Sequence, residues 1–196
     1  MPDQDTTVEQ KLAWIASGEH GVVTRAQLLE AGVTRAEIEH RMRVGSLIRV
    51  HPGVYRVGHR APSVEARYLA AVRACGEGAV LSGRAAAHLH RLLKGPPPPP
   101  EVTTPAKRRV SGVKTRRSRV DAREFTSVRG IPVTVPRTLV DLAADLTLHD
   151  LARACHEAGV LHRTTPAQVE VVLARPRTAA ARQSCGRSCG AASRSR

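Results

Sequence analysis

Aromatic residues are scarce in this 196-residue chain, which has one tryptophan, two tyrosines and one phenylalanine, or 2% of the sequence. Proteins that bind single-stranded nucleic acids stack the bases on aromatic side chains, so the scarcity argues against that class of function. The hydrophobic share is nevertheless 41%. A packed core must therefore be built from Leu, Val, Ile and Ala, and the chain is long enough for one ordinary domain or two small ones.

The four cysteines form no Cys-x-x-Cys pair. Cys185 and Cys189 are the nearest two, but no histidine lies in their segment, so they make a poor zinc site. Cys75 and Cys155 stand far from them and from each other. We expect all four to be reduced thiols. No carboxylate cluster and no nucleophile with a neighbouring base is recognisable, so the sequence predicts no catalytic residue, no bound metal and no cofactor.

Long apolar runs are also absent. No stretch of about 18 apolar residues is present that would predict a membrane span. The first residues, MPDQDTTVEQ, are acidic and polar, unlike a secretory signal. We therefore expect a cytoplasmic protein that has no membrane partner.

Residues 20–60 predict a short helix, a tight turn, a second helix and two short strands. Thr24 followed by Gln27, and Thr34 followed by Glu37, match the capping-box pattern that opens a helix. This order of elements is typical of a winged helix-turn-helix, which lays its second helix in the major groove of double-stranded DNA.

The wing of this module is predicted from two β-prone runs, residues 47–50 and 54–57. They are separated by His51-Pro52-Gly53, and Pro-Gly favours a type II turn.

Charge is distributed unevenly within the same segment. Residues 1–39 hold three basic and seven acidic side chains, whereas residues 40–60 hold five arginines and no acid. The affinity of a protein for DNA depends on local neutralisation of phosphates, so a one-sided basic surface is what the DNA backbone selects. The polarity supports the DNA-binding interpretation even though the segment is almost neutral as a whole.

The second predicted helix has a core face and an exposed face. Ile38 and Met42 are four residues apart and point toward the core. Arginine on the opposite face could bind guanine bidentately, and Glu39 could accept from a cytosine amino group. The alternative is an exposed helix with ordinary solvated charge. The predicted DNA contacts of helix and wing are Thr34, Arg35, Glu39, His40, Arg41, Arg43, Arg49, His51 and Arg56.

The remaining chain alternates between helix and strand signals. A helix is expected from Ser63 to Gly76, followed by a short buried strand at 79–81 and a helix that begins at Ser82. A stiff polyproline connection spans 96–100, strands are expected within 101–134, and three helices within 135–174. The expected class is α+β: a winged helix-turn-helix at 1–60, a small mixed α/β domain at 61–174, and a disordered basic tail at 175–196.

Three smaller expectations concern packing. Leu28 and Leu29 should both face inward. Arg137 and Asp141, four residues apart, should pair on a helix surface. His88 and His90 are two residues apart on a helix, so they point in different directions and are expected at the surface or at a helix end rather than on one metal ion.

The densest positive charge lies outside the winged helix. Residues 102–130 hold nine basic and two acidic side chains. Such a patch could extend a DNA footprint through phosphate contacts, or it could receive an acidic partner protein; a solvated sheet face is the plainest alternative. The residues of this possible secondary patch are Lys107, Arg108, Arg109, Lys114, Arg116, Arg117 and Arg119.

The run TRAQLLEAGVTRAEIEHRMRVGSLIRVHPGVYRVG resembles the N-terminal domain of AbiE-type (AbiEi) antitoxins, the transcriptional-regulator half of type IV toxin–antitoxin systems. Residues 130–143, GIPVTVPRTLVDLA, resemble the second signature of that family, a Gly-Ile-Pro strand followed by a Pro-Arg-Thr-Leu helix with an acid. Taken together the resemblance covers about residues 7–174.

This resemblance implies a non-enzymatic autorepressor that binds operator DNA and acts as an antitoxin. Its counterpart would be a nucleotidyltransferase-like toxin, not necessarily in direct contact. One alternative is a stand-alone winged-helix transcription factor without a toxin. Another is a truncated relative of restriction-endonuclease-like proteins, because many similar proteins continue into such a domain and its acidic and lysine motif is missing here.

Overall fold

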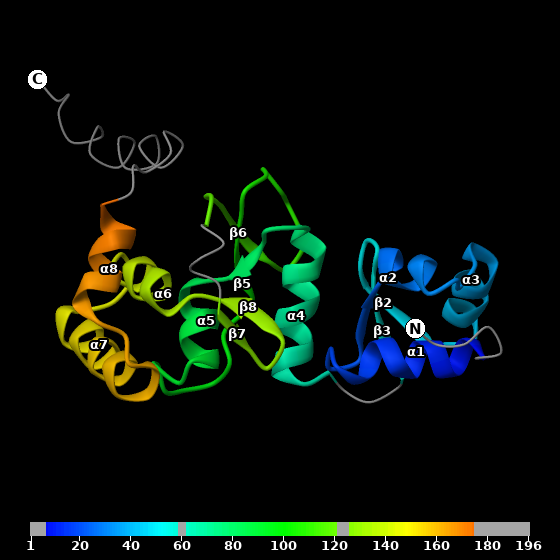
Figure 1. The fold of residues 1–196 in the computed structure, drawn as a ribbon, viewed down its shortest axis with the longest axis horizontal. Helices are drawn as coiled ribbons and strands as arrows, with labels where there is room; N and C mark the ends of the chain where they lie inside the picture. Colours follow the sequence, from blue (N-terminus) through cyan, green and yellow to red (C-terminus); the bar gives the residue numbers. More distant parts are fainter. Residues whose placement is uncertain (1–6, 59–61, 121–125, 175–196) are drawn as a thin grey trace, which may run out of the picture.

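The computed structural model of the protein describes residues 7–58, 62–120 and 126–174. Its elements form a row of layers, seen from right to left in Figure 1: helices α1–α3, a three-stranded sheet, helix α4, a five-stranded sheet, and helices α5–α8. This arrangement confirms the expected α+β class. The predicted tail at 175–196 lies outside the described residues.

The first unit has the element order of a winged helix-turn-helix. Both expected capping boxes are confirmed, at Thr24 and at Thr34, and Thr7 forms a third. A strand that the sequence did not predict, β1, pairs with β3, so the sheet order is β1-β3-β2 and all pairs are antiparallel. The elements are α1 (Val8–Ser17), β1 (Val22–Thr24), α2 (Arg25–Glu30), α3 (Arg35–Arg43), β2 (Leu47–His51) and β3 (Val54–Val57).

The helices of the first unit cover one face of this sheet. Leu28, Ile38 and Leu47 are at most 1% exposed and pack together. The expectation that Leu29 faces inward is wrong, because its side chain is 41% exposed. Neighbouring residues of a helix point about 100° apart, so a short helix that buries Leu28 fully leaves the next side chain outside.

The second unit is a mixed α/β layer, as expected. Its sheet has the order β6-β5-β4-β8-β7, with the pairs β5–β6 and β4–β8 parallel and the other two antiparallel. Its elements are α4 (Val64–Cys75), β4 (Val80–Leu81), α5 (Gly83–Leu89), β5 (Glu101–Thr104), β6 (Lys114–Arg117), β7 (Thr126–Val128), β8 (Ile131–Val133), α6 (Val135–Leu142), α7 (Leu148–His162) and α8 (Pro166–Leu173).

Helix α4 belongs to the cores of both units. One continuous apolar cluster contains Val22 and Val54 from the first sheet, Tyr68 from α4, and Leu81 and Val102 from the second sheet. Each of these side chains is at most 2% exposed. The apolar core therefore continues across the boundary that the sequence predicted near residue 60.

Beyond the winged helix, Tyr68 attaches a loop to this core, and His90 links the end of α5 to α7. The Tyr68 hydroxyl donates to the carbonyl oxygen of Pro98 at 3.0 Å, which attaches the polyproline connection to α4. His90 is the C-cap of α5, so the expected position at a helix end is confirmed. It does not lie at the surface, because it is only 2% exposed. Its ring packs edge-on against His162 of α7, and burial lowers the pKa of His90 to about 4, so it stays neutral near pH 7.

Candidate nucleic-acid interface

Helix α3 turns one side to the core and the other to solvent. Ile38 is 1% exposed and anchors the inner side, as its spacing predicted. Arg35, Glu39, His40 and Arg43 are all exposed on the remainder of the helix. The structure therefore brings together four of the predicted DNA contacts on one helical surface.

The start of α3 is fixed by its cap. The Thr34 hydroxyl accepts from the backbone N–H of Glu37 at 3.3 Å and donates to its carboxylate at 2.6 Å. The hydroxyl and the backbone N–H of Thr34 both donate to the Glu37 carboxylate and lower its pKa, so this carboxylate is ionised at neutral pH and held at the first turn. Thr34 was predicted to contact DNA, but its hydroxyl is hydrogen-bonded to Glu37 in the helix cap.

Arg41 is placed differently from the other arginines of α3. Its guanidinium forms an ion pair with Glu9 of α1, and its side chain is only 16% exposed. The sequence predicted Arg41 as a DNA contact beside Arg43. The difference arises because α1 packs beside α3, which brings an acid from a distant part of the chain within reach.

The two wing arginines lie on opposite faces of the sheet. Arg49 pairs across the strands with Tyr55, whose side chain belongs to the core under α1–α3. Arg56 pairs with Ile48 and with Val22, on the face toward α4. There it lines a cavity of about 230 Å³ between sheet and helix, which Arg49 also borders. Directly paired residues share a face, so Arg49 alone of the two stands on the side of α3.

His51 contributes little positive charge to the wing. It is half-buried at the end of β2, and burial lowers its pKa below the usual value for histidine. The imidazole is therefore mostly neutral near pH 7. The wing tip itself is held in place, because the backbone N–H of Arg25 donates to the carbonyl oxygen of Gly53 at 2.8 Å.

The secondary basic patch divides into paired and unpaired cations. On β6, the Lys114 ammonium lies 3.1 Å from the carboxylate of Glu101. Arg116 lies between two acids of the α6 region, 3.6 Å from Asp141 and 3.7 Å from Asp145. Lys114 and Arg116 therefore serve to hold the strand.

Asp141 is the centre of this pairing, and its environment differs from the expectation. It accepts a hydrogen bond from Arg137 Nε at 3.1 Å, so the predicted pair is confirmed, but Asp141 is only 4% exposed. Burial raises its pKa despite the two arginines, and its Oδ2 has no hydrogen-bond partner among the described residues. Asp141 is therefore buried, while Arg137 remains partly exposed and Arg116 approaches the aspartate from β6.

Replacing Asp141 with asparagine should change how stability depends on pH. A carboxyl group whose pKa is raised in the folded state binds protons more readily there than in the unfolded chain. Wild type should therefore gain stability relative to Asp141→Asn as pH falls through the folded pKa, which lies above 3.8. Urea unfolding of both proteins between about pH 4 and pH 8 measures the difference. A difference that is constant, or that shrinks as pH falls, would contradict the raised pKa.

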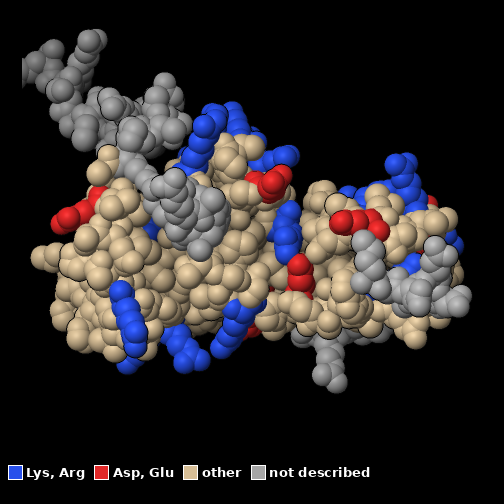
Figure 2. Space-filling model, viewed as in Figure 1, with Lys and Arg blue, Asp and Glu red and all other residues tan. Residues whose placement is uncertain are grey.

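The other five cations of the patch are displayed to solvent. All are exposed, and none pairs with an acidic side chain within the part of the chain that the structure describes. Figure 2 shows basic side chains above the β6 region and again above α2 and α3, with a few acidic side chains between, and further basic side chains along the opposite edge. These five, the basic loop surface, are Lys107, Arg108, Arg109, Arg117 and Arg119.

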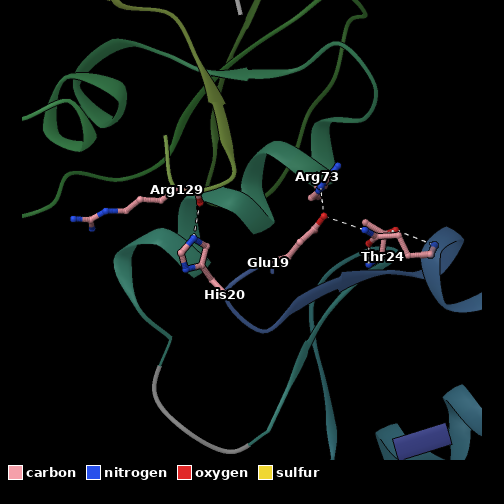
Figure 3. A network of polar contacts seen from close by, with 6 residues as sticks. Glu19, His20, Thr24, Arg73 and Arg129 are labelled. Atoms are coloured by element: carbon pink, nitrogen blue, oxygen red, sulfur yellow. Dashed lines mark hydrogen bonds and ion pairs between the residues drawn. The ribbon is translucent and has the colours of Figure 1, made fainter. Parts of the chain in front are cut away.

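A polar junction fixes the first unit against the second (Figure 3). Glu19 forms an ion pair with Arg73 of α4, and His20 Nε2 makes a 2.6 Å hydrogen bond with the carbonyl oxygen of Arg129. The Arg129 side chain in turn pairs with Glu65 of α4. His20 and Arg129 both have positive φ, a conformation that non-glycine residues keep only where their surroundings hold it. The relative placement of the two basic surfaces is thus built into the fold.

Residues that could serve other functions are few. Among residues 7–58, 62–120 and 126–174, no three His, Cys, Asp or Glu side chains lie together as metal ligands would. None of the helices there is long and apolar enough to cross a membrane. Cys75 is buried and Cys155 exposed, and both are free thiols.

Residues 10–58 match the family described as "Transcriptional regulator, AbiEi antitoxin". This segment is AbiEi-like. The match confirms the resemblance inferred from the N-terminal motif and relates the segment to transcriptional regulators rather than to enzymes. The second signature, at 130–143, lies outside the matched residues.

Over its whole length the chain has weaker similarities. No curated protein matches it. Among solved structures, the RV2827C protein from Mycobacterium tuberculosis is 20% identical, with a TM-score of 0.42 over 90% of this chain and 84% of that one.

Proposed function

We propose that the protein is a cytoplasmic DNA-binding autorepressor, without catalytic activity, that acts as the antitoxin of a type IV toxin–antitoxin system. The observation that carries the proposal is the exposed face of α3, which displays Arg35 and Arg43 within a segment that matches the AbiEi regulators. Double-stranded operator DNA is its first partner.

In this proposal α3 enters the major groove. Arg35 and Arg43 make bidentate contacts with guanines, Glu39 accepts from a cytosine amino group, and His40 contacts base or phosphate. Arg49 reaches the phosphate backbone from the wing, on the same side of the sheet. Thr34 orders the first turn of the recognition helix, so its effect on binding is indirect.

The antitoxin half of the proposal concerns the second unit. By its resemblance to the family, residues 61–174 would oppose a nucleotidyltransferase-like toxin encoded beside this protein. Such opposition does not require the two proteins to touch. The experiment is coexpression: cells that carry the neighbouring toxin gene should survive when this protein is present, and should still survive with a variant whose α3 no longer binds DNA.

The test of DNA binding uses the region upstream of the protein's own gene. Purified protein should shift this duplex in a gel and protect a discrete site from nuclease cleavage, in the presence of excess competitor DNA. The logarithm of the affinity should fall linearly with the logarithm of salt concentration, by about 0.9 for each phosphate contacted. Equal affinity for the upstream region and for scrambled duplexes would refute an autorepressor.

A stand-alone transcription factor is the second candidate. The extent of the family match favours it, because the match ends at residue 58 and does not include the proposed antitoxin unit at 61–174. The coexpression experiment separates the two, because a plain transcription factor should bind its operator yet give no protection from any neighbouring toxin.

A further inference from the structure

The basic loop surface consists of the cations of the patch that have no acidic partner among the described residues. Two of the seven cations in the patch, Lys114 and Arg116, are neutralised by acids of β5 and α6. Two of the three acids are buried, Glu101 at 7% exposed and Asp141 at 4%, whereas Asp145 is exposed. Glu101, Asp141 and Asp145 are thus paired with the cations of β6. The cations at 107–109, 117 and 119 face solvent and have no acidic partner among the described residues.

The same ion pairs hold the surface in a fixed position. Strand β6 is an edge strand that pairs only with β5, in parallel, from Glu101↔Lys114 to Thr104↔Arg117. The Thr115 hydroxyl donates to the carbonyl oxygen of Arg108 at 2.8 Å, and Arg117 Nε donates to that of Pro105 at 3.4 Å. These bonds fasten the connection between β5 and β6 to the strand, so its cations are presented from an ordered loop.

The composition of this segment distinguishes between the two partners that its charge allows. Residues 105–120 contain no aromatic residue and no Leu, Ile or Met. Protein–protein interfaces depend on buried aromatic and apolar anchors at their centre, and nothing here supplies one. Its two central apolar side chains, Val110 and Val113, pack against the core. What remains outside is arginine, lysine and serine, the side chains that contact phosphates.

The position of the segment points to the same duplex that α3 would hold. In Figure 2 the basic side chains above β6 and those above α2 and α3 stand along the same edge of the molecule. The shared core around α4 and the junction at Glu19 and His20 keep this relation constant.

We propose that the basic loop surface binds the phosphate backbone of the operator duplex beyond the turn of DNA that α3 occupies. The second unit thereby lengthens the footprint and raises affinity without reading sequence. This inference rests on the proposed function, since it takes the DNA held by α3 as its ligand.

The test compares two duplexes that share the same operator centre, one of about one helical turn and one of about three. The variant Lys107→Ala/Arg109→Ala/Arg119→Ala removes three exposed cations. The control, Lys94→Ala/Arg153→Ala/Arg163→Ala, removes the same charge from three exposed positions beside α5 and on or next to α7. Thermal melting should show that both variants remain folded.

On the long duplex the loop variant should bind roughly 10- to 100-fold more weakly at 0.15 M salt, and its salt slope should fall by about 2.7. On the short duplex it should equal wild type within about twofold, because the surface lies beyond that DNA. The control should differ little from wild type on either duplex.

Three results would overturn the inference. An unchanged slope on the long duplex would leave the surface to an acidic protein partner. An equal loss of affinity on both duplexes would mean that the loop acts through α3. An equal loss of affinity in the control variant would mean that net charge alone causes the effect. Failure of the proposed function looks different: wild type would then not prefer the short operator duplex over a scrambled one, while the long-duplex loss in the loop variant would still be measurable.

Discussion

Alanine at both Arg35 and Arg43 should weaken operator binding by about 30-fold or more and should remove most of the preference over scrambled DNA. Each bidentate contact between arginine and guanine is worth about 1–3 kcal/mol of discrimination. The two side chains are exposed and make no ion pair with acidic groups of the described chain, so folding should be unaffected. Gel-shift titrations with operator and scrambled duplexes measure both the affinity and the ratio.

Arg41→Ala is the matched control, since it removes one arginine from the same helix. Arg41 is paired with Glu9 and mostly buried, so its loss should change affinity by less than about threefold. The assignment of the α3 face fails if Arg41→Ala weakens binding as much as the double variant. It also fails if the double variant binds more weakly to every duplex alike, since this would make both arginines phosphate contacts.

Helical periodicity was sufficient to predict much of this surface. The capping boxes at Thr24 and Thr34 and the core position of Ile38 depend only on residues within one or two turns, and they are confirmed. The pairing of Arg41 with Glu9 depends on how α1 packs against α3. Local patterns cannot specify such a contact, so the sequence could not separate Arg41 from Arg43.

The wing shows a second limit of sequence reasoning. A regular two-residue turn at Pro52-Gly53 would pair Arg49 with Arg56 and set both on one face. The register instead shifts between Arg49 and His51, so that Arg49 lies opposite Tyr55. An extra residue in one strand exchanges the faces of every side chain beyond it. Nothing in the alternation of these short strands indicated the bulge.

In the second unit the sequence predicted the helices and strands better than it predicted which side chains are buried. The spacing of Arg137 and Asp141 correctly predicted a pair, but a helix-only argument places both at the surface. The aspartate is buried because Arg116 reaches it from β6, an edge strand whose position follows from the parallel β5–β6 pairing. Parallel pairs join segments through long connections, and such pairings are invisible to a local pattern.

Replacing Tyr68 with alanine should destabilise the whole molecule by about 3–5 kcal/mol, the usual cost of deleting a large buried aromatic side chain. Tyr68 is fully buried in the cluster that joins the first sheet, α4 and the second sheet. Both units should therefore lose stability together. Urea unfolding should be followed by the fluorescence of Trp14, the only tryptophan, which lies in α1, and by far-ultraviolet circular dichroism.

Tyr68→Phe separates packing from hydrogen bonding. Burial raises the pKa of Tyr68 to about 12, so its phenol stays protonated and donates to Pro98 at neutral pH. Losing this bond alone should cost about 0.5–1.5 kcal/mol, with coincident transitions by both probes in all three proteins. If Tyr68→Ala shifted the circular dichroism transition and left the Trp14 transition in place, the winged helix would unfold independently. The core shared through α4 would then not couple the DNA-binding surface to the rest of the chain.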